Sequence, residues 1–175
     1  MQRLDKEYYT LDAVSLAQRL IGKLLCRKIE DKVIKKRITE TEAYLGESDT
    51  ACHAHKGKTK RTSVMYKQGG VSYIYLCYGM YNMLNVVSGK EDSPQAVLIR
   101  GIEGYNGPGK LTKYLNITRE LNDVDLTSSN DIWIEDENVL LEYKKTPRIG
   151  ISYAEKKDRE RLWRFVVEKD DKKTK

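Results

Sequence analysis

Two predicted β-hairpins constrain the fold of this chain more than any other feature of its sequence. In the first, the strand-like segment "LLCRKI" reaches a turn at Glu30-Asp31 and is followed at once by "KVIKKRITETEAYL". In the second, "VSYIYLC" alternates as a strand and "NMLNVVS" is its partner, so that Tyr78 to Tyr81 lie near the turn. Strands joined by such short turns pair antiparallel, because a parallel pair needs a much longer connection. The two hairpins therefore predict a largely antiparallel sheet.

The other predicted elements surround this sheet. Thr10 can cap a helix whose apolar positions recur every three or four residues. A second, short helix, "KLTKYLN", follows Pro108 and Gly109. Further strands are predicted at "QAVLIRG", "DIWIE" and "LWRFVVE". The apolar positions of the first helix are Leu11, Val14, Ala17, Ile21 and Leu24.

The length of the chain indicates how these elements are organised. It has 175 residues, with no internal repeat and no convincing linker, which favours one domain with a sizeable hydrophobic core. We predict a single mixed α+β domain over residues 1–175 with a largely antiparallel, curved β-sheet, surrounding helices and a protruding β-hairpin. The charged end, from about residue 170 to residue 175, is expected to be frayed.

The charge of the chain is unevenly distributed. The net charge is +6, yet no Asp or Glu occurs between Thr50 and Lys90. A solvated loop with a chance run of lysines is one interpretation of this segment. Basic side chains interleaved with aromatic ones instead favour phosphate contacts beside stacked bases, and we assign the phosphate contacts to four residues. They are Lys56, Lys58, Lys60 and Arg61.

A cluster of tyrosines lies in the same acid-free segment. The chain has twelve tyrosines and one phenylalanine, and "YIYLCYGMY" holds four of the tyrosines. Tyr73 and Tyr75 share one face of their predicted strand, whereas Tyr78 lies at the turn. A tyrosine on the strand can line a pocket wall, and one at the hairpin tip can wedge between base pairs. Packing in the core is the alternative interpretation, and it suits Tyr73 best and could also include Tyr81.

Cysteine usage and hydropathy restrict the compartment. Cys26, Cys52 and Cys77 form no C-x-x-C pair, and an odd, sparse count favours reduced thiols. The first residues, "MQRLDKEYY", lack an apolar signal core, and no run approaches the roughly 18 apolar residues that a membrane span needs. We expect a soluble intracellular protein with no membrane partner.

Two glutamates are candidates for acid–base chemistry. Glu40 and Glu42 share one face of the long predicted strand with Ile34 and Ile38 if the period of two holds. A glutamate in a strand commonly belongs to a solvated face, but a carboxylate within reach of water can also accept a proton. From the residues alone, both glutamates remain candidates for the proton acceptor.

Four blocks of the sequence are distinctive, namely "ITETEAYLGESDTACHAHKGKTKR", "YIYLCYGMYNMLNVV", "VLIRGIEG" and "GPGKLTKYLNI". Together they resemble one known family, the alkyladenine (3-methyladenine) DNA glycosylases. The resemblance runs from about Leu11 to the C-terminal "RFVV". Lys60 stands where proline is frequent in that family and Thr62 where asparagine is frequent, which bears on loop detail and lesion preference.

The resemblance implies a base-excision-repair enzyme that acts on double-stranded DNA. Such enzymes flip an alkylated or deaminated purine out of the duplex and hydrolyse its N-glycosidic bond, which leaves an abasic site. The implied substrates are of the class of 3-methyladenine, 7-methylguanine, hypoxanthine and ethenoadenine. Neither a lysine nucleophile nor a cofactor is implied. We therefore expect a monomeric, monofunctional glycosylase, cytoplasmic near the nucleoid in a prokaryote and nuclear otherwise.

The resemblance also assigns roles to single residues. Glu42 matches the catalytic glutamate that activates water, and Arg100 matches a residue that holds this water and the nearby phosphate. Tyr78 matches the wedge that fills the vacated space. Asn85 matches a position that disfavours normal guanine by crowding its 2-amino group. The positions that sandwich the flipped base are Tyr44, His53 and Tyr75.

The "CHAH" stretch offers an alternative role for His53. Cys52, His53 and His55 could be metal ligands, but the second half of a zinc site is missing from the remaining chain. We therefore expect no metal, with His53 as a stacking and hydrogen-bonding pocket residue and Cys52 as a small buried filler.

Two other function classes stay open at this point. A non-catalytic nucleic-acid-binding module would keep the basic segment and the aromatic residues but would not need Glu42. A metal-dependent nuclease would need clustered carboxylates, for which "ETE" is a thin candidate. A gel assay separates the three, because only a glycosylase leaves damaged DNA intact until alkali cleaves the abasic site.

Overall fold

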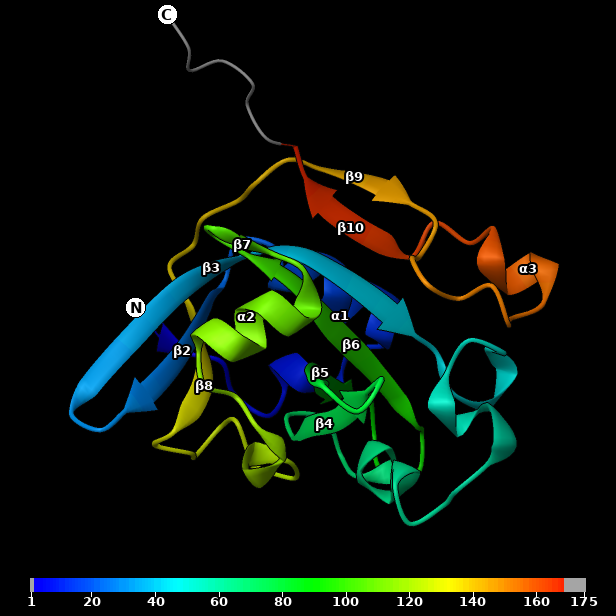
Figure 1. The fold of residues 1–175 in the computed structure, drawn as a ribbon, viewed down its shortest axis with the longest axis horizontal. Helices are drawn as coiled ribbons and strands as arrows, with labels where there is room; N and C mark the ends of the chain where they lie inside the picture. The colour runs from blue at the N-terminus through cyan, green and yellow to red at the C-terminus, as the bar shows by residue number, and fades with distance from the viewer. Residues whose placement is uncertain (1, 169–175) are drawn as a thin grey trace, which may run out of the picture.

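The sheet of this protein is antiparallel throughout. The computed structural model describes residues 2–168, and in this range ten strands join one sheet. The main path is β1-β8-β2-β3-β6-β5-β4, with β10 beside β3 and β9, and β7 beside β6 (Figure 1). The predicted α+β fold is confirmed. The strands are β1 (Gln2–Arg3), β2 (Leu24–Ile29), β3 (Lys32–Tyr44), β4 (Ser72–Cys77), β5 (Tyr81–Ser88), β6 (Gln95–Ile102), β7 (Tyr105–Asn106), β8 (Ile132–Asp136), β9 (Tyr143–Thr146) and β10 (Arg164–Val167).

Helices cover both faces of the sheet. In Figure 1, α2 lies in front of the sheet and α1 lies behind it. The hydroxyl of Thr41 in β3 donates to the Ala17 carbonyl of α1 at 2.8 Å, which ties α1 to the rear face. The helices are α1 (Ala13–Leu20), α2 (Pro108–Tyr114) and α3 (Lys156–Arg159), with the 3-10 helices η1 (Tyr8–Thr10), η2 (Gly46–Ser48), η3 (His53–Lys56), η4 (Thr62–Tyr66) and η5 (Arg119–Leu121).

The first helix is shorter than the sequence pattern predicts. Leu11 is extended, with φ −60° and ψ 151°, so Thr10 ends η1 and does not cap α1. The cap is Asp12, whose Oδ1 accepts the Ser15 N–H at 3.0 Å. Leu24 is not part of the helix either, because it begins β2. The apolar periodicity continues across these boundaries because Leu11 packs against the main core and Leu24 is buried in a smaller cluster with Cys26 and Trp133.

Strand β3 does not keep an unbroken period of two. Its pairing with β6 shifts register between Ile38 and Glu40 and again between Glu40 and Thr41. A Cβ on Gly101, opposite Glu40, would lie 3.0 Å from the Glu40 Cβ, so glycine permits this close approach. The irregularity means that the strand face predicted for Ile34 and Ile38 cannot simply be extended to the glutamates.

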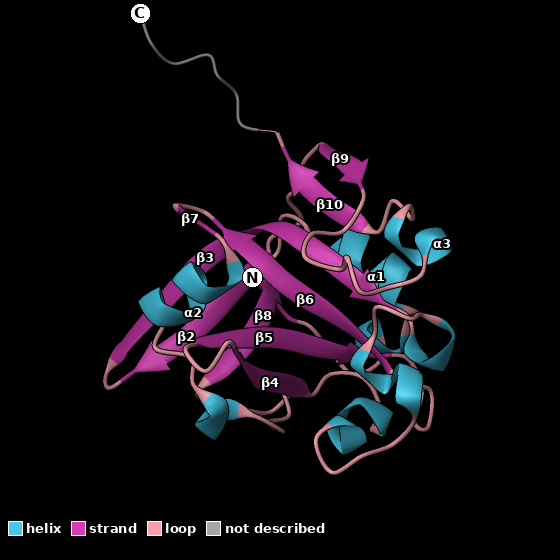
Figure 2. Ribbon diagram, turned by 45° about the vertical axis from the view of Figure 1, so that its right-hand side comes forward, coloured by secondary structure: helices cyan, strands magenta, loops and turns pink. Residues whose placement is uncertain are grey.

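The first half of the acid-free segment folds as short turns beside one end of the sheet, and its second half forms the β4–β5 hairpin. Helices η3 and η4 lie in the first half, close to η2 (Figure 2). Their buried side chains form a small cluster of their own that packs against β4 and β5. The sequence predicted a loop at "GKTK" but no helical turns, because single turns have no periodicity to detect.

The C-terminal part adds two strands, β10 and β9, to the sheet beside β3. Strand β10, predicted from "LWRFVVE", pairs with β3 so that Arg164 lies opposite Glu42 and Val166 opposite Glu40. Strand β9 and helix α3 were not predicted. The expected fraying from about residue 170 lies outside the described residues. No helix within residues 2–168 has the length and apolar character that crossing a membrane requires.

The cap of α1 can be tested by stability. Asp12→Ala should lower the free energy of unfolding by about 1 kcal/mol, because the helix loses the acceptor for its first free N–H groups. Thr10→Ala is the control and should cost less, since its hydroxyl only donates to the Glu7 carbonyl. Urea denaturation measures both, and an equal or larger loss in Thr10→Ala would contradict the observed cap.

Candidate active site

A cavity opens on the face of the sheet opposite α1. Its volume is about 470 Å³, within the range of about 300–1,000 Å³ usual for small-molecule sites. Strands β3 to β6, the turns near η3 and the loop before α3 all contribute to its wall. The lining residues with polar or aromatic side chains are Tyr44, His53, Arg61, Tyr73, Tyr75, Tyr78, Asn85, Arg100 and Tyr153.

Glu42 lies directly behind the wall of this cavity. Its side chain is fully buried. Oε1 accepts from the Tyr44 hydroxyl at 3.0 Å and from Arg100 Nη1 at 3.4 Å, and Oε2 accepts from the Ile149 N–H at 2.6 Å. Burial raises the pKa of Glu42 above its ordinary value, although Arg100 and the two other donors act in the opposite direction. A carboxylate with a raised pKa beside a cavity is suited to accept a proton.

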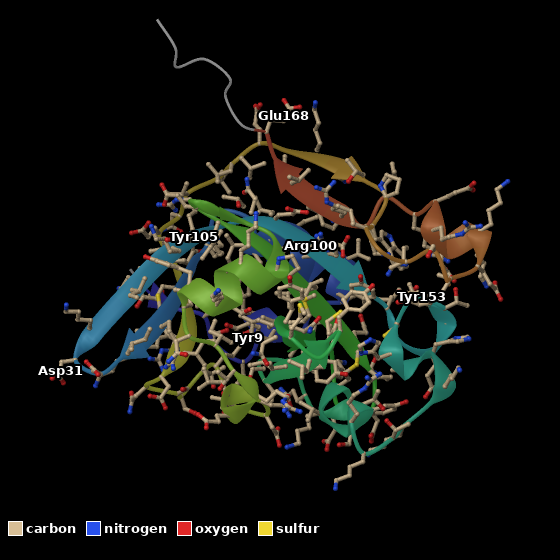
Figure 3. All side chains as sticks on the ribbon, viewed as in Figure 1. Tyr9, Asp31, Arg100, Tyr105, Tyr153 and Glu168 are labelled. Carbon is tan, nitrogen blue, oxygen red and sulfur yellow. The ribbon has the colours of Figure 1, made fainter. Side chains whose placement is uncertain are left out.

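Arg100 connects Glu42 with Glu40. Its Nε donates to Glu40 Oε1 at 3.0 Å, and Arg164 Nε donates to the same oxygen at 2.6 Å. Burial opposes the charge of Arg100, but the two glutamates raise its pKa, so the side chain stays cationic. In Figure 3, Arg100 is seen near the centre of the molecule. Both glutamates thus lie on the cavity side of β3.

The two glutamates differ in their partners. Glu40 is paired with two arginines, and of these only Arg100 is part of the cavity wall. All three donors to Glu42 belong to residues of the wall, namely Tyr44, Arg100 and Ile149. Glu42 is therefore connected to the cavity wall more directly than Glu40 is. The sequence alone did not distinguish the two glutamates.

Three aromatic residues form the sides of the cavity. The rings of His53 and Tyr75 meet edge to face, with centroids 4.5 Å apart. Among the described residues, no ring contact joins Tyr44 to either of them. His53 and Tyr75 thus contact each other, whereas Tyr44 lines the cavity without a ring contact to either of them.

His53 is held in a defined protonation state. Its Nδ1 lies 3.0 Å from the Tyr73 hydroxyl, and Tyr73 is buried, as predicted for a core residue. Burial, with a smaller contribution from Arg61, lowers the pKa of His53 to about 4. The imidazole is thus neutral at pH 7 and adds no positive charge to the cavity.

Asn85 lies in the cavity wall and is almost completely buried. Its Nδ2 donates to the backbone carbonyls of Tyr73 at 3.1 Å and Met83 at 3.3 Å. Both amide hydrogens are used in these bonds, so the side chain has a fixed orientation on β5.

Tyr78 protrudes from the β4–β5 hairpin at the rim of the cavity. Its side chain is 89% exposed. Both Tyr78 and Gly79 have positive φ, 52° and 67°, as a tight turn closed by the Met80 N–H to Cys77 carbonyl bond requires. This backbone conformation is unfavourable for a bulky residue such as tyrosine. Tyr81 is 47% exposed, so the interpretation of Tyr81 as a core residue is wrong.

The four predicted phosphate contacts are all exposed, and within residues 2–168 none of them forms an ion pair. Arg61 lines the cavity, and the ammonium of Lys58 lies 5.3 Å from the centre of the Tyr66 ring. Lys67 differs, because Asp123 neutralises it at 2.6 Å. The four residues are Lys56, Lys58, Lys60 and Arg61.

The turn that carries these cations is closed by Thr62. Its buried Oγ1 accepts the Thr59 N–H at 2.8 Å and donates to the Gly57 carbonyl at 3.2 Å.

Within the described part of the chain, no group of three or more His, Cys, Asp or Glu side chains is placed to hold a metal ion. His55 instead lies with Nδ1 2.8 Å from the Glu47 carbonyl, and Cys52 is buried.

Comparison with known proteins identifies the family of this chain. The sequence profile of the methylpurine-DNA glycosylase family matches residues 7–105 and 102–171. The chain belongs to this family. The predicted resemblance and the enzyme class, a DNA-3-methyladenine glycosylase and thus a hydrolase, are confirmed.

Curated relatives match over nearly their whole length. A protein of Borrelia garinii subsp. bavariensis is 46% identical, with 97% of both chains covered, and one of Clostridium novyi is 41% identical, with 98% of both covered. A protein of Sodalis glossinidius is 46% identical over 93% of this chain and 95% of the relative. The name given to all three is "Putative 3-methyladenine DNA glycosylase".

Parts of the site were not found from the sequence. The Ile149 backbone N–H bonds Glu42, and Arg148 and Tyr153 lie beside or in the wall, yet all three come from a stretch with no recognisable motif. A backbone donor leaves no mark on residue identity. Three-dimensional placement of the loop before α3 was needed to find it.

The neutral state of His53 predicts a pH dependence of stability. The unfolded chain binds a proton near the ordinary pKa of 6.5, and the folded chain binds it only near pH 4. The free energy of unfolding should therefore fall as the pH drops through this window. His53→Gln should show a shallower fall, measured by urea denaturation between pH 7 and pH 4. The control is His55→Gln, at an exposed ring, and a fall in His53→Gln as steep as in the wild type would rule out the shifted pKa.

Proposed function

We propose that this protein excises alkylated or deaminated purines from double-stranded DNA, with Glu42 activating the water that hydrolyses the N-glycosidic bond. The observation that carries this proposal is the buried Glu42 carboxylate with its three donors at the cavity wall. Lesions of the 3-methyladenine, 7-methylguanine, hypoxanthine and ethenoadenine class are the proposed substrates.

The carboxylate can still accept one more hydrogen bond. An ionised carboxylate offers about four lone-pair sites, and three donors occupy Glu42. A water at the remaining site would lie next to Arg100, whose guanidinium has further N–H groups to hold it. Glu42 takes the proton as this water attacks C1′ of the sugar. The negative charge of Glu42 also stabilises the cationic sugar that develops as the base leaves.

The aromatic residues account for base binding. We propose that a flipped purine lies between Tyr44 on one side and His53 with Tyr75 on the other. Stacking on such rings is worth about 1–3 kcal/mol per base. A base alkylated at N3 or N7 is cationic, and a neutral His53 does not repel it. Asn85, fixed on β5, is the proposed barrier to the 2-amino group of guanine.

The hairpin tip accounts for flipping. Glycine or asparagine would suit the positive φ of Tyr78 better than tyrosine does, and the ring gains little from packing because it is 89% exposed. Tyrosine at this position is therefore better explained by contact with a bound molecule than by a contribution to folding. We propose that Tyr78 enters the duplex and fills the space that the flipped base leaves.

Duplex DNA then lies across the cavity mouth and the acid-free segment. The exposed cations Lys56, Lys58, Lys60 and Arg61 are free to contact phosphates.

The protein is proposed to act as a monomer, with residues 1–175 as one catalytic domain without a cofactor. Since the named relatives are bacterial, the proposed substrate is nucleoid DNA. Glu40 and Glu42 are both engaged by arginine, which makes them poor ligands for a nuclease metal.

The role of Glu42 predicts a specific loss of chemistry. Glu42→Gln keeps the shape but cannot take a proton, so excision should fall by at least about 10²–10⁴-fold while lesion binding survives. Single-turnover excision is measured on oligonucleotides that each carry one defined lesion, with alkali cleavage of the abasic product.

Glu40→Gln is the matched control for this experiment. It removes the same charge two residues away and should reduce excision much less, because Glu40 only pairs with Arg100 and Arg164. Loss of excision in Glu40→Gln together with an active Glu42→Gln would reverse the assignment. If the wild type released none of the lesions, the proposed function itself would be wrong.

The wedge predicts a dependence on the strength of the base pair. Tyr78→Ala should lose binding and excision for a lesion in a stable pair, because nothing then replaces the extruded base. A mispaired lesion, which costs less to extrude, should suffer less. Met80→Ala, at a neighbouring position that is 66% exposed, is the control. Equal losses on both kinds of duplex would show that Tyr78 does not act as a wedge.

A further inference from the structure

We propose that Arg148 is a positioning residue that holds the Tyr44 ring against the flipped base; this inference rests on the proposed function. The guanidinium carbon of Arg148 lies 4.8 Å from the centre of the Tyr44 ring. Tyr44 and Ile149 belong to the cavity wall, and Arg148 does not. The guanidinium therefore covers the face of Tyr44 that is turned away from the cavity.

Arg148 is itself held rigidly. Its side chain is fully buried and forms a two-bond ion pair with Asp49, at 2.6 and 2.9 Å. It also donates to the Ala43 carbonyl at 2.8 Å and to the Asp158 carbonyl at 3.2 Å. Ala43 precedes Tyr44 in β3, so the same guanidinium is anchored to the backbone of the strand whose ring it covers. Buried and planar, it forms a fixed platform for that ring.

The platform is supported from behind. The guanidinium carbon of Arg148 lies 5.1 Å from the centre of the Trp163 ring, and that of Arg161 lies 4.4 Å from the same ring. Cation and ring thus alternate from Arg161 through Trp163 and Arg148 to Tyr44, and the series ends at the cavity. Asp49 balances the charge of Arg148, so a cationic base on the open face of Tyr44 does not meet an uncompensated positive charge.

Two parts of the catalytic arrangement depend on this platform. The plane of the Tyr44 ring determines how a base stacks, and the Tyr44 hydroxyl bonds Glu42 at 3.0 Å. The residue after Arg148, Ile149, gives its N–H to the same carboxylate at 2.6 Å. Arg148 is not part of the cavity wall, so its influence on the reaction passes mainly through the Tyr44 ring, with the Ile149 N–H as a second, smaller route.

A double-mutant cycle tests this dependence. Arg148→Lys keeps the positive charge but loses the planar platform, and it is made in the wild type and in Tyr44→Leu. Single-turnover excision and affinity are measured with an oligonucleotide that contains one ethenoadenine. We expect a loss of about tenfold or more in the wild type and of about twofold or less in Tyr44→Leu, where no ring is left to position.

Controls separate positioning from folding. Arg161→Lys makes the same change on the far side of Trp163, where the side chain does not contact Tyr44, and should reduce excision less than Arg148→Lys does. Urea denaturation reports the stability of every variant. If Arg148→Lys does not fold, Asp49→Asn, which weakens the hold on Arg148, replaces it in the same cycle. Equal losses in both backgrounds, or no loss in the wild type, would overturn the role of Arg148. Absence of excision by the wild type would instead overturn the proposed function.

Discussion

Burial of the Glu42 carboxylate is the constraint on which the rest of the site depends. An ionised carboxylate removed from water is costly unless donors replace its hydration. The donors come from three parts of the chain, namely Tyr44 in β3, Arg100 in β6 and the Ile149 N–H in the loop before α3. The register of β3 with β6 and the docking of the C-terminal part must therefore both be correct before the carboxylate is accommodated. The same strand register and the same docking of the C-terminal part also form the cavity wall.

Charge balance in this region extends beyond one residue. Arg100 serves both Glu40 and Glu42, and Arg164 of β10 adds a second cation at Glu40. The pairing of β10 with β3 places Arg164 there. A buried group of alternating charges is rigid when all members are satisfied. It keeps Arg100 in the cavity wall, with its guanidinium against the Glu42 carboxylate.

Local sequence patterns and motifs predicted part of the fold and part of the candidate site. Both hairpins and the class of fold agree with the structure. Tyr44, His53, Tyr75 and Asn85, which the family resemblance brought together, line one cavity and Tyr78 is exposed, while their roles stay predictions. The errors and omissions have physical causes. Thr10 was predicted as the helix cap, whereas the cap is Asp12, because apolar spacing does not mark where a chain turns extended. Arg148 and the Ile149 N–H escaped detection because a buried cation and a backbone donor gain their roles only from distant partners.

The pH dependence of excision tests the account most directly. Single-turnover excision of an uncharged lesion such as hypoxanthine is measured for the wild type and for Glu42→Gln across the acidic range. Because burial raises the pKa of Glu42, wild-type excision should fall as the pH drops through a midpoint above the ordinary glutamate value of 4.5. The slow residual excision of Glu42→Gln should lack that step. The same acid step in Glu42→Gln would show that another group takes the proton and would contradict the central role of Glu42.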